Sequence, residues 1–224
     1  MIGGLRLRHV PAAGAEITTE ALFKRHSRSI SAPNKPRGDF VRTAYLSGRA
    51  YGLARDALQF SYLLKTKQEA DVLQAVKIIE PRAQRIEVLT ESGGPAVYVD
   101  IGLDSLLPLA LCGEGFVRLF SLIVEMTSSR HGVLLADEID TGLHYAAMPK
   151  LWQLLRELTR RHDVQLIATT HNEEIVDYAL REFSDADQPI GLFRIDRNDR
   201  GHSVAAYDRA AQEAVAHEGF EVRG

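Results

Sequence analysis

Cysteine is nearly absent from this 224-residue sequence, which contains a single one, Cys112. One cysteine excludes an internal disulfide framework and is typical of a protein kept in a reducing cytosol. No apolar run approaches the ~20 residues that a membrane-spanning helix requires. The first residues, MIGGLRLRHVPAAGAE, contain no continuous apolar segment of the kind found in a secretory signal. The sequence therefore predicts a cytoplasmic protein that has no membrane association.

A strong excess of charge is also missing, since the formal net charge is −3. This small value excludes a global electrostatic attraction to nucleic acid or to an acidic membrane. Residues 24–37 hold a modest basic cluster, which we interpret as a solvated loop, with a phosphate-contacting surface as the alternative. Apolar residues make up 45% of the chain, which is enough for a sizeable core.

Apolar periodicity separates an irregular first part from an ordered remainder. Residues 1–50 are predicted to be irregular, whereas residues 51–78 have helical spacing and predict two helices. The segment QRIEVLTESGGPAVYVDIG predicts two strands joined by a Gly-Gly-Pro turn. A glycine-rich turn, CGEGFVR, is expected to open a helix. One face of this helix would carry five apolar residues: Phe116, Leu119, Phe120, Ile123 and Val124.

From residue 132 onward, apolar strands alternate with helices. GVLLAD and VQLIATT predict buried strands, and residues 146–162 and NEEIVDYALREF predict helices, with Pro149 tolerated in a first turn. IGLFRID and HSVAAYD predict a closing hairpin. Apolar strands separated by helices indicate an α/β fold with a mostly parallel sheet that helices cover on both faces.

Polar residues follow both of the predicted parallel strands. Asp137 and Glu138 come directly after the first strand, and Thr170 and His171 follow the second. Ligands of open parallel sheets bind beyond the C-terminal strand ends, so these side chains should gather at one edge. Asp137 is suited to hold Mg²⁺, Glu138 to orient and deprotonate a water, and His171 to contact a terminal phosphate. Alone, two acids after an apolar run are weak evidence for nucleotide chemistry.

The spacing between motifs strengthens this hypothesis. The order of CGEGFVR, LLADEID and ATTH resembles the C-terminal half of ABC-type P-loop ATPases. It looks most like the AAA-type core of OLD-like ATPases, which carry a GEG turn, a DEI-x-NGLH segment and ATTH in this order. The likeness covers residues 55–224 and is most specific over residues 102–175. It implies the C-terminal lobe of an ABC-type P-loop NTPase with an additional β-hairpin, formed by residues 51–224.

The resemblance assigns the glycine-rich turn to the signature loop of such ATPases. Gly113 and Gly115 would face ATP held by a second subunit, and Arg118 would support the loop. Many ABC proteins have a serine early in this loop, where the present chain has Glu114. A carboxylate beside a terminal phosphate is repulsive, so no phosphate contact is assigned to Glu114.

The resemblance also assigns roles to the acids and the histidine. Asp137 would be the metal-binding residue of Walker B and Glu138 the catalytic base. Asp140 would lie in the D-loop at a dimer interface, and His171 would be the switch histidine. The implied reaction is hydrolysis of ATP with Mg²⁺ between two head-to-tail subunits. A DNA or effector-nuclease partner is suggested by the family alone.

One motif of such an ATPase is absent from the sequence. None of the lysines follows a glycine, so there is no G-x-x-x-x-G-K-[ST] phosphate loop. The resemblance then implies the C-terminal part of a longer ATPase, with residues 1–50 as the remnant of its first half, or one half of a split enzyme. The isolated chain is expected to bind ATP weakly and to hydrolyse it negligibly. A homodimer, or a complex with a chain that supplies the loop, would be needed.

Two alternatives remain. The chain could be a catalytically inactive ATPase remnant that acts as a dimerisation or regulatory module. A nuclease is less favoured, because Asp185 and Asp187 form an isolated Asp-x-Asp pair without the further carboxylates of a two-metal site. We interpret this pair as part of a polar loop. Cys112 is expected to be a buried packing residue.

Overall fold

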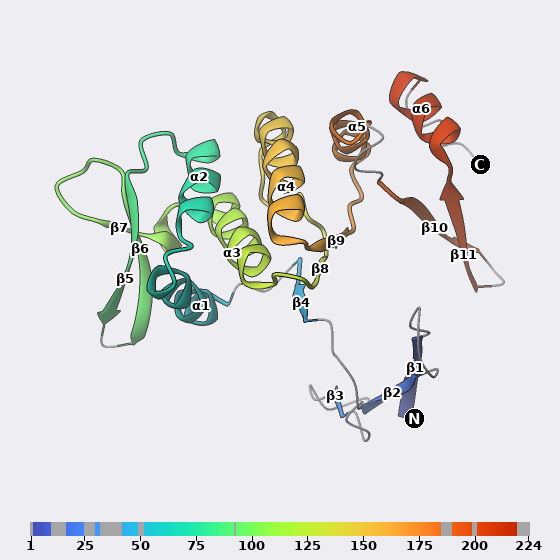
Figure 1. Cartoon of the computed structure of the whole chain (residues 1–224), viewed down its shortest axis with the longest axis horizontal. Coiled ribbons are helices and arrows are strands. Elements are labelled where there is room, and N and C mark those ends of the chain that lie inside the picture. Colours follow the sequence, from blue (N-terminus) through green and yellow to red (C-terminus); the bar gives the residue numbers. More distant parts are fainter. Residues whose placement is uncertain are drawn as a thin grey trace. The chain divides into compact units, whose positions relative to one another are not determined.

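The computed structural model describes residues 2–9, 17–24, 30–31, 42–48, 52–91, 93–184, 190–198 and 201–218. The chain divides into two compact units, Met1–Phe40 and Val41–Gly224 (Figure 1). The smaller unit is an antiparallel sheet in the order β1-β2-β3, formed by Ile2–His9, Ile17–Lys24 and Ile30–Ser31. Strands therefore occupy part of the stretch that sequence periodicity predicts to be irregular.

A three-stranded parallel sheet lies in the larger unit, in the order β4-β8-β9. Its strands are Thr43–Leu46, Val133–Ala136 and Gln165–Ala168. Leu46 pairs with Ala136, which in turn pairs with Ala168. This register brings the C-terminal ends of all three strands into one row. The sequence pattern predicts the neighbours β8 and β9, whereas β4 lies within residues 1–50, which are predicted to be irregular.

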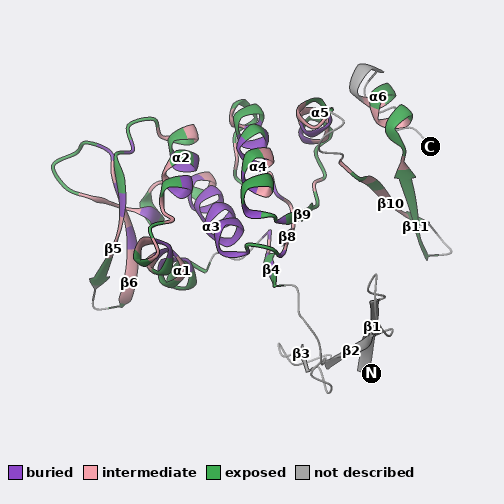
Figure 2. Cartoon of the chain, viewed as in Figure 1, coloured by how far each residue is buried: buried purple, intermediate pink, exposed green. Residues whose placement is uncertain are grey.

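Helix α3 (Glu114–Ser128) forms the centre of the larger unit. It contacts α1 (Leu53–Lys65), α2 (Ala70–Ile79), α4 (Met148–His162) and the parallel strands β4 and β8. Every residue from Phe116 to Ser128 is buried, so the helix is buried all round rather than on the single apolar face predicted (Figure 2). A helix surrounded on all sides is expected to be mostly apolar, and the polar side chains on α3 each need an explanation.

An antiparallel sheet lies beside α1, in the order β5-β6-β7. Its strands are Arg85–Glu91, Gly94–Asp100 and Leu107–Pro108. Strands β5 and β6 form the predicted hairpin, and Gly94 in its turn has a φ of 112°. A short 3₁₀ turn, η1 (Leu109–Leu111), then leads into α3.

The chain after β8 also follows the predicted order. A 3₁₀ turn, η2 (Tyr145–Ala147), leads into α4, which has Pro149 in its first turn and ends at Asp163 in a left-handed conformation. Helix α5 (Glu173–Glu182) follows β9. The strands β10 (Leu192–Asn198) and β11 (Gly201–Tyr207) form the closing hairpin, followed by α6 (Arg209–Glu218). Among the described helices, none is long and apolar enough to cross a membrane.

The two faces of the parallel sheet differ in burial. Ala44, Leu134 and Ala136 are buried on one face. On the other face, Tyr45 of β4 and Ile167 of β9 remain 55% and 50% exposed. The prediction that β9 is a buried strand is therefore wrong in this respect, because all of its residues except Leu166 are exposed. The apolar run of β9 reflects its place in a parallel sheet, but β9 is an edge strand of that sheet.

Candidate functional site

The backbone joins the strand ends into one continuous edge. Asp137 N–H donates to the carbonyl of Leu46 at 2.9 Å, and Thr169 N–H donates to that of Ala136 at 2.9 Å. Ile139 N–H then donates to the carbonyl of Thr169 at 3.0 Å. We call residues 137–142 the acidic loop. Its first residues are thus held by both neighbouring strands, in the place where parallel sheets bind ligands.

The hydroxyl of Thr169 connects the two acids of this loop. It donates to Oδ1 of Asp137 at 2.7 Å and accepts from the backbone N–H of Glu138 at 2.9 Å. Among the described residues, no side chain donates to Oδ2 of Asp137. The hydrogen bond to Oδ1 fixes the rotation of the Asp137 carboxylate, and that rotation also sets the position of Oδ2.

Glu138 has an unusual backbone conformation for a residue with a side chain. Its φ is 47°, in the left-handed region that glycine and asparagine occupy far more readily. Its side chain is 31% exposed, and Oε2 accepts from Thr141 Oγ1 at 3.3 Å. A Cβ on Gly48, just after β4, would lie 2.9 Å from Oε2 of Glu138. Glycine at position 48 thus leaves the space that this carboxylate occupies.

His171 and Asp140 lie at the same edge. Nε2 of His171 is 3.9 Å from Oε1 of Glu138, and the imidazole is 89% exposed. Asp140 Oδ1 accepts from the hydroxyl of Thr170 at 2.6 Å. Asn172 caps α5 by accepting from the N–H of Glu174 at 3.0 Å, which fixes where the chain turns after His171. The structure therefore brings together Asp137, Glu138, Asp140 and His171.

Arg118 reaches this edge from inside the molecule. It is fully buried on α3, and its guanidinium donates to the carbonyls of Ser47, Asp137 and Glu138. Arginine stays protonated when buried and presents a rigid fork of donors, which suits it to hold several carbonyls at once. Arg118 thus binds the ends of β4 and β8 within its own chain, a contact that sequence reasoning does not predict.

The glycine turn, residues 112–115, packs against the acidic loop. A Cβ on Gly115 would lie 2.1 Å from the carbonyl oxygen of Gly142, so no side chain fits there in the chain's own fold. Gly113 has a φ of 93°, and a Cβ there would meet nothing within 4 Å. Glycine is therefore favoured at the two positions for different reasons. At Gly115 the reason is close backbone contact, and at Gly113 it is the backbone conformation.

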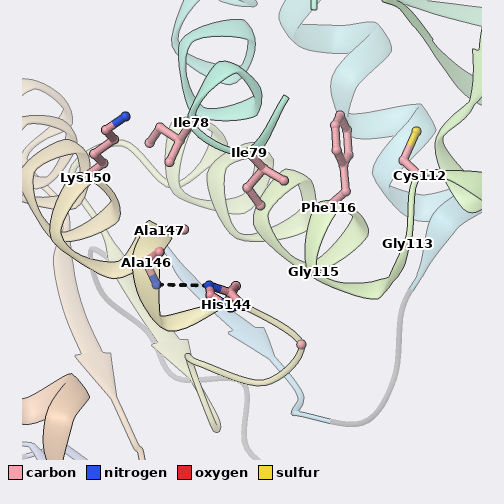
Figure 3. A pocket seen from close by; sticks show the side chains of 11 residues that line it. Ile78, Ile79, Cys112, Gly113, Gly115, Phe116, His144, Ala146, Ala147 and Lys150 are labelled. Carbon is pink, nitrogen blue, oxygen red and sulfur yellow. Dashed lines mark hydrogen bonds between the residues drawn. The ribbon is translucent and has the colours of Figure 1, made fainter. Parts of the chain in front are cut away.

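A pocket of about 370 Å³ adjoins the glycine turn (Figure 3). Gly113, Gly115 and Phe116 line one part, and His144 and Lys150 contribute the polar part. Nδ1 of His144 accepts from the N–H of Ala146 at 3.2 Å. Neither Asp137 nor Glu138 lines this pocket.

The donor set limits how a metal could bind. Within the described ranges, no group of three or more His, Cys, Asp or Glu side chains is placed to hold a metal ion. Mg²⁺ commonly uses one or two carboxylates together with waters and substrate phosphates. The oriented carboxylate of Asp137 fits that pattern and does not fit an all-protein metal cage.

Other sequence candidates have different surroundings. Cys112 is half-buried, its Sγ lies 3.5 Å from the carbonyl of Pro108, and burial raises the pKa of its thiol. This agrees with a packing role. Asp185 and Asp187 and most of the basic cluster lie outside the described residues. The site residue that sequence reasoning passes over is Thr169, whose position at the end of β9 is the one signal for it.

Comparison with known families and structures gives one extensive match. Residues 12–177 match the family described as "AAA domain, putative AbiEii toxin, Type IV TA system". Among curated proteins, no relative matches the chain at a significant level.

Several solved structures are similar to the chain at low identity. One, from work on ATP-driven dimerisation and DNA-stimulated activation of SMC ATPases, is 13% identical with a TM-score of 0.48, covering 74% of this chain and 99% of that one. The SMC head domain of Thermotoga maritima is 15% identical with a TM-score of 0.46, covering 92% and 74%. The Pyrococcus furiosus Smc head with an extended coiled coil, bound to the C-terminal domain of ScpA, is 12% identical with a TM-score of 0.49. This chain spans 39% of its length.

Proposed function

We propose that this chain, which belongs to the AAA domain family described as putative AbiEii toxin, binds ATP with Mg²⁺ at the acidic loop. One observation carries the proposal: Asp137 and Glu138 end a parallel strand, and the next strand holds both through Thr169. Parallel sheets bind ligands at this edge, and two acids held in different ways can perform different tasks.

Each side chain has a distinct task in this proposal. Mg²⁺ bound with ATP would offset negative charge on the phosphates. Asp137 would hold it through the carboxylate that Thr169 orients. Glu138, whose carboxylate is partly exposed, would accept a proton from the attacking water. The exposed imidazole of His171 would contact the terminal phosphate, at a point close to Glu138.

Complete turnover requires a second chain in this proposal. The sequence has no Gly-Lys phosphate loop, the main anchor for the ATP phosphates in P-loop enzymes. We assign the chain to the OLD-like class, in which a site is shared between two subunits. Gly113, where an added Cβ would meet no atom within 4 Å, would face nucleotide on the partner, and Asp140 would lie at the shared interface.

The alternative function is an interaction module without turnover. The absence of a phosphate-loop motif favours it. The retained geometry around Glu138 favours the ATPase, because a strained residue persists only where its surroundings hold it. ATP-dependent dimerisation separates the two, since only the first function needs nucleotide to change the assembly.

The test compares wild type with Glu138→Gln, using Glu173→Gln as a matched control on the exposed start of α5. We expect wild type to bind Mg-ATP with a Kd of ~1 mM, equal to about −4 kcal/mol. In complex with a chain that supplies the phosphate loop, Glu138→Gln should keep the wild-type affinity and accumulate an ATP-bound dimer, because the water cannot be deprotonated. Equilibrium dialysis with labelled ATP and sedimentation velocity measure both quantities, and phosphate release measures turnover.

The outcomes separate the two functions. Saturable Mg-ATP binding, with more ATP-bound dimer in Glu138→Gln than in Glu173→Gln, supports the ATPase. A wild-type chain that dimerises without regard to ATP supports the interaction module. Full turnover by the isolated 224-residue chain would contradict the requirement for a second chain.

A further inference from the structure

We infer that Thr169 is a positioning residue that sets the geometry of both acids at the candidate site; this inference rests on the proposed function. Its hydroxyl has two partners on the acidic loop, one as donor and one as acceptor. It donates to Oδ1 of Asp137 at 2.7 Å and accepts from the N–H of Glu138 at 2.9 Å. A single hydroxyl therefore sets the rotation of one carboxylate and the backbone of the next residue.

The backbone of Glu138 needs such a restraint. A φ of 47° is costly for a residue with a Cβ and persists where neighbouring groups determine it. Four hydrogen bonds hold the backbone here. The Glu138 N–H donates to the hydroxyl of Thr169, and Ile139 N–H donates to the carbonyl of Thr169. The Glu138 carbonyl accepts from Arg118 and from the N–H of Thr141. Two of the four involve Thr169, the residue that follows β9, and its hydroxyl is the acceptor of the Glu138 amide itself.

The consequence for chemistry lies in where the Glu138 carboxylate points. In the left-handed conformation, its side chain leaves the loop between Gly48 and Thr141 and comes within 3.9 Å of His171. Relaxation to ordinary φ values would redirect the Cα–Cβ bond and move the carboxylate away from this place. Thr169 thus keeps the candidate base on the same side as the candidate metal ligand.

The neighbouring threonine provides a matched comparison. Thr170 Oγ1 donates to Asp140 and accepts from the N–H of Asn172, and among the described residues it makes no hydrogen bond to Asp137 or Glu138. The same substitution at adjacent positions therefore removes hydroxyls of different function. Thr169 is exposed, so replacing it by valine, which keeps the shape but lacks the hydroxyl, does not open the core.

The test measures amide hydrogen exchange at Glu138 by NMR in wild type, Thr169→Val, Thr169→Ser and Thr170→Val. Loss of the acceptor should speed exchange of the Glu138 amide about tenfold in Thr169→Val, the factor expected for one hydrogen bond. Thr169→Ser keeps the hydroxyl and should exchange as wild type does. Thr170→Val should leave the Glu138 amide unchanged.

A second measurement connects the geometry to the ligand. ATP affinity is measured with and without Mg²⁺, and the ratio reports the metal contribution. Thr169→Val should lower that ratio about tenfold, the factor for one charge-assisted hydrogen bond, while metal-free ATP binding stays the same. Thr169→Ser keeps the hydroxyl and should give the wild-type ratio, an outcome that general destabilisation would not produce.

The outcomes distinguish this inference from the proposed function. If wild type binds Mg-ATP and Thr169→Val matches it in exchange or in the Mg²⁺ ratio, the positioning role is wrong and the ATPase proposal stands. If wild type does not bind ATP with or without Mg²⁺, the proposed function is wrong and this inference falls with it.

Discussion

Two pairs of carboxylates in the larger unit have opposite surroundings. Asp56 on α1 and Glu125 on α3 lie in the helical core, 3% and 2% exposed, whereas Asp137 and Glu138 lie at the water-facing edge of the sheet. Ser121 donates to Asp56, and Arg55 and Gln59 bind Glu125, so each core carboxylate has protein partners. Burial raises the pKa of Asp56, with the charge of Glu125 adding to the effect.

The difference separates a structural arrangement from one suited to a ligand. In the core pair, partners surround the carboxylates and burial opposes their charge. At the edge, hydroxyls and backbone groups orient the acids and leave part of each accessible to water. Helix α3 connects the two regions, because it carries Glu125 and the Ser121 that donates to Asp56, and also Arg118, which holds the edge.

Arg118→Met should have the largest effect on stability, and it should act at the sheet edge that carries Asp137 and Glu138. The change removes a donor from each of three partly buried carbonyls, and we expect a loss of about 3 kcal/mol of unfolding free energy. Urea unfolding measures it, with Arg181→Met as the control, an exposed arginine paired with Asp177 on α5. A loss equal to that of the control would contradict a clamping role for Arg118.

Gly115→Ala should have the second-largest effect on stability, because it pushes the glycine turn away from the acidic loop. The new Cβ would lie 2.1 Å from the carbonyl oxygen of Gly142, and overpacking of this kind costs about 2 kcal/mol. Gly52→Ala is the control, since its Cβ would make an ordinary contact with Arg55. Thermal unfolding of both variants measures the cost, and similar midpoints would show that the loop moves aside freely.

Asp56→Asn should have the smallest effect and act on the core pair alone. Because the folded pKa of Asp56 is raised, wild type loses stability as pH rises through that pKa, and the asparagine variant does not. The free energy of the variant minus that of wild type should increase from pH 5 to pH 8, by on the order of 1 kcal/mol. Urea unfolding at both pH values measures this difference. A difference that stays constant over that interval would mean that folding does not raise the pKa of Asp56.

The strand ends of the candidate site could be predicted from sequence, but not the contacts between them. Apolar runs that stop at Asp137 and at Thr169 indicate two neighbouring strand ends. That the Thr169 hydroxyl meets both acids depends on the register of β8 against β9, which no local pattern encodes. The buried clamp of Arg118 depends on how α3 is rotated, and helical periodicity predicts one apolar face where every face is covered.

The exposure of β9 illustrates another limit. An apolar run predicts a place within a parallel sheet, but not what covers each side of it, so the half-exposed Ile167 could not be predicted. Similarly, β1 and β2 lie in a stretch whose sequence has no clear helical or strand period. Long elements with a clear period, such as α4, agree closely with expectation because their own residues determine them.

The burial of α3 has a consequence for the order of events during synthesis. Helices α1 and α2 and strand β4 precede α3 in the chain, whereas β8 and α4, which also contact it, follow. A nascent chain released as far as Ser128 therefore carries an apolar helix with only some of its final neighbours. Chains emerge from the ribosome at about 5–20 residues per second, so this helix waits a few seconds for the rest. Ribosomes stalled before and after synthesis of α4 would therefore hold α3 without and with this neighbouring helix.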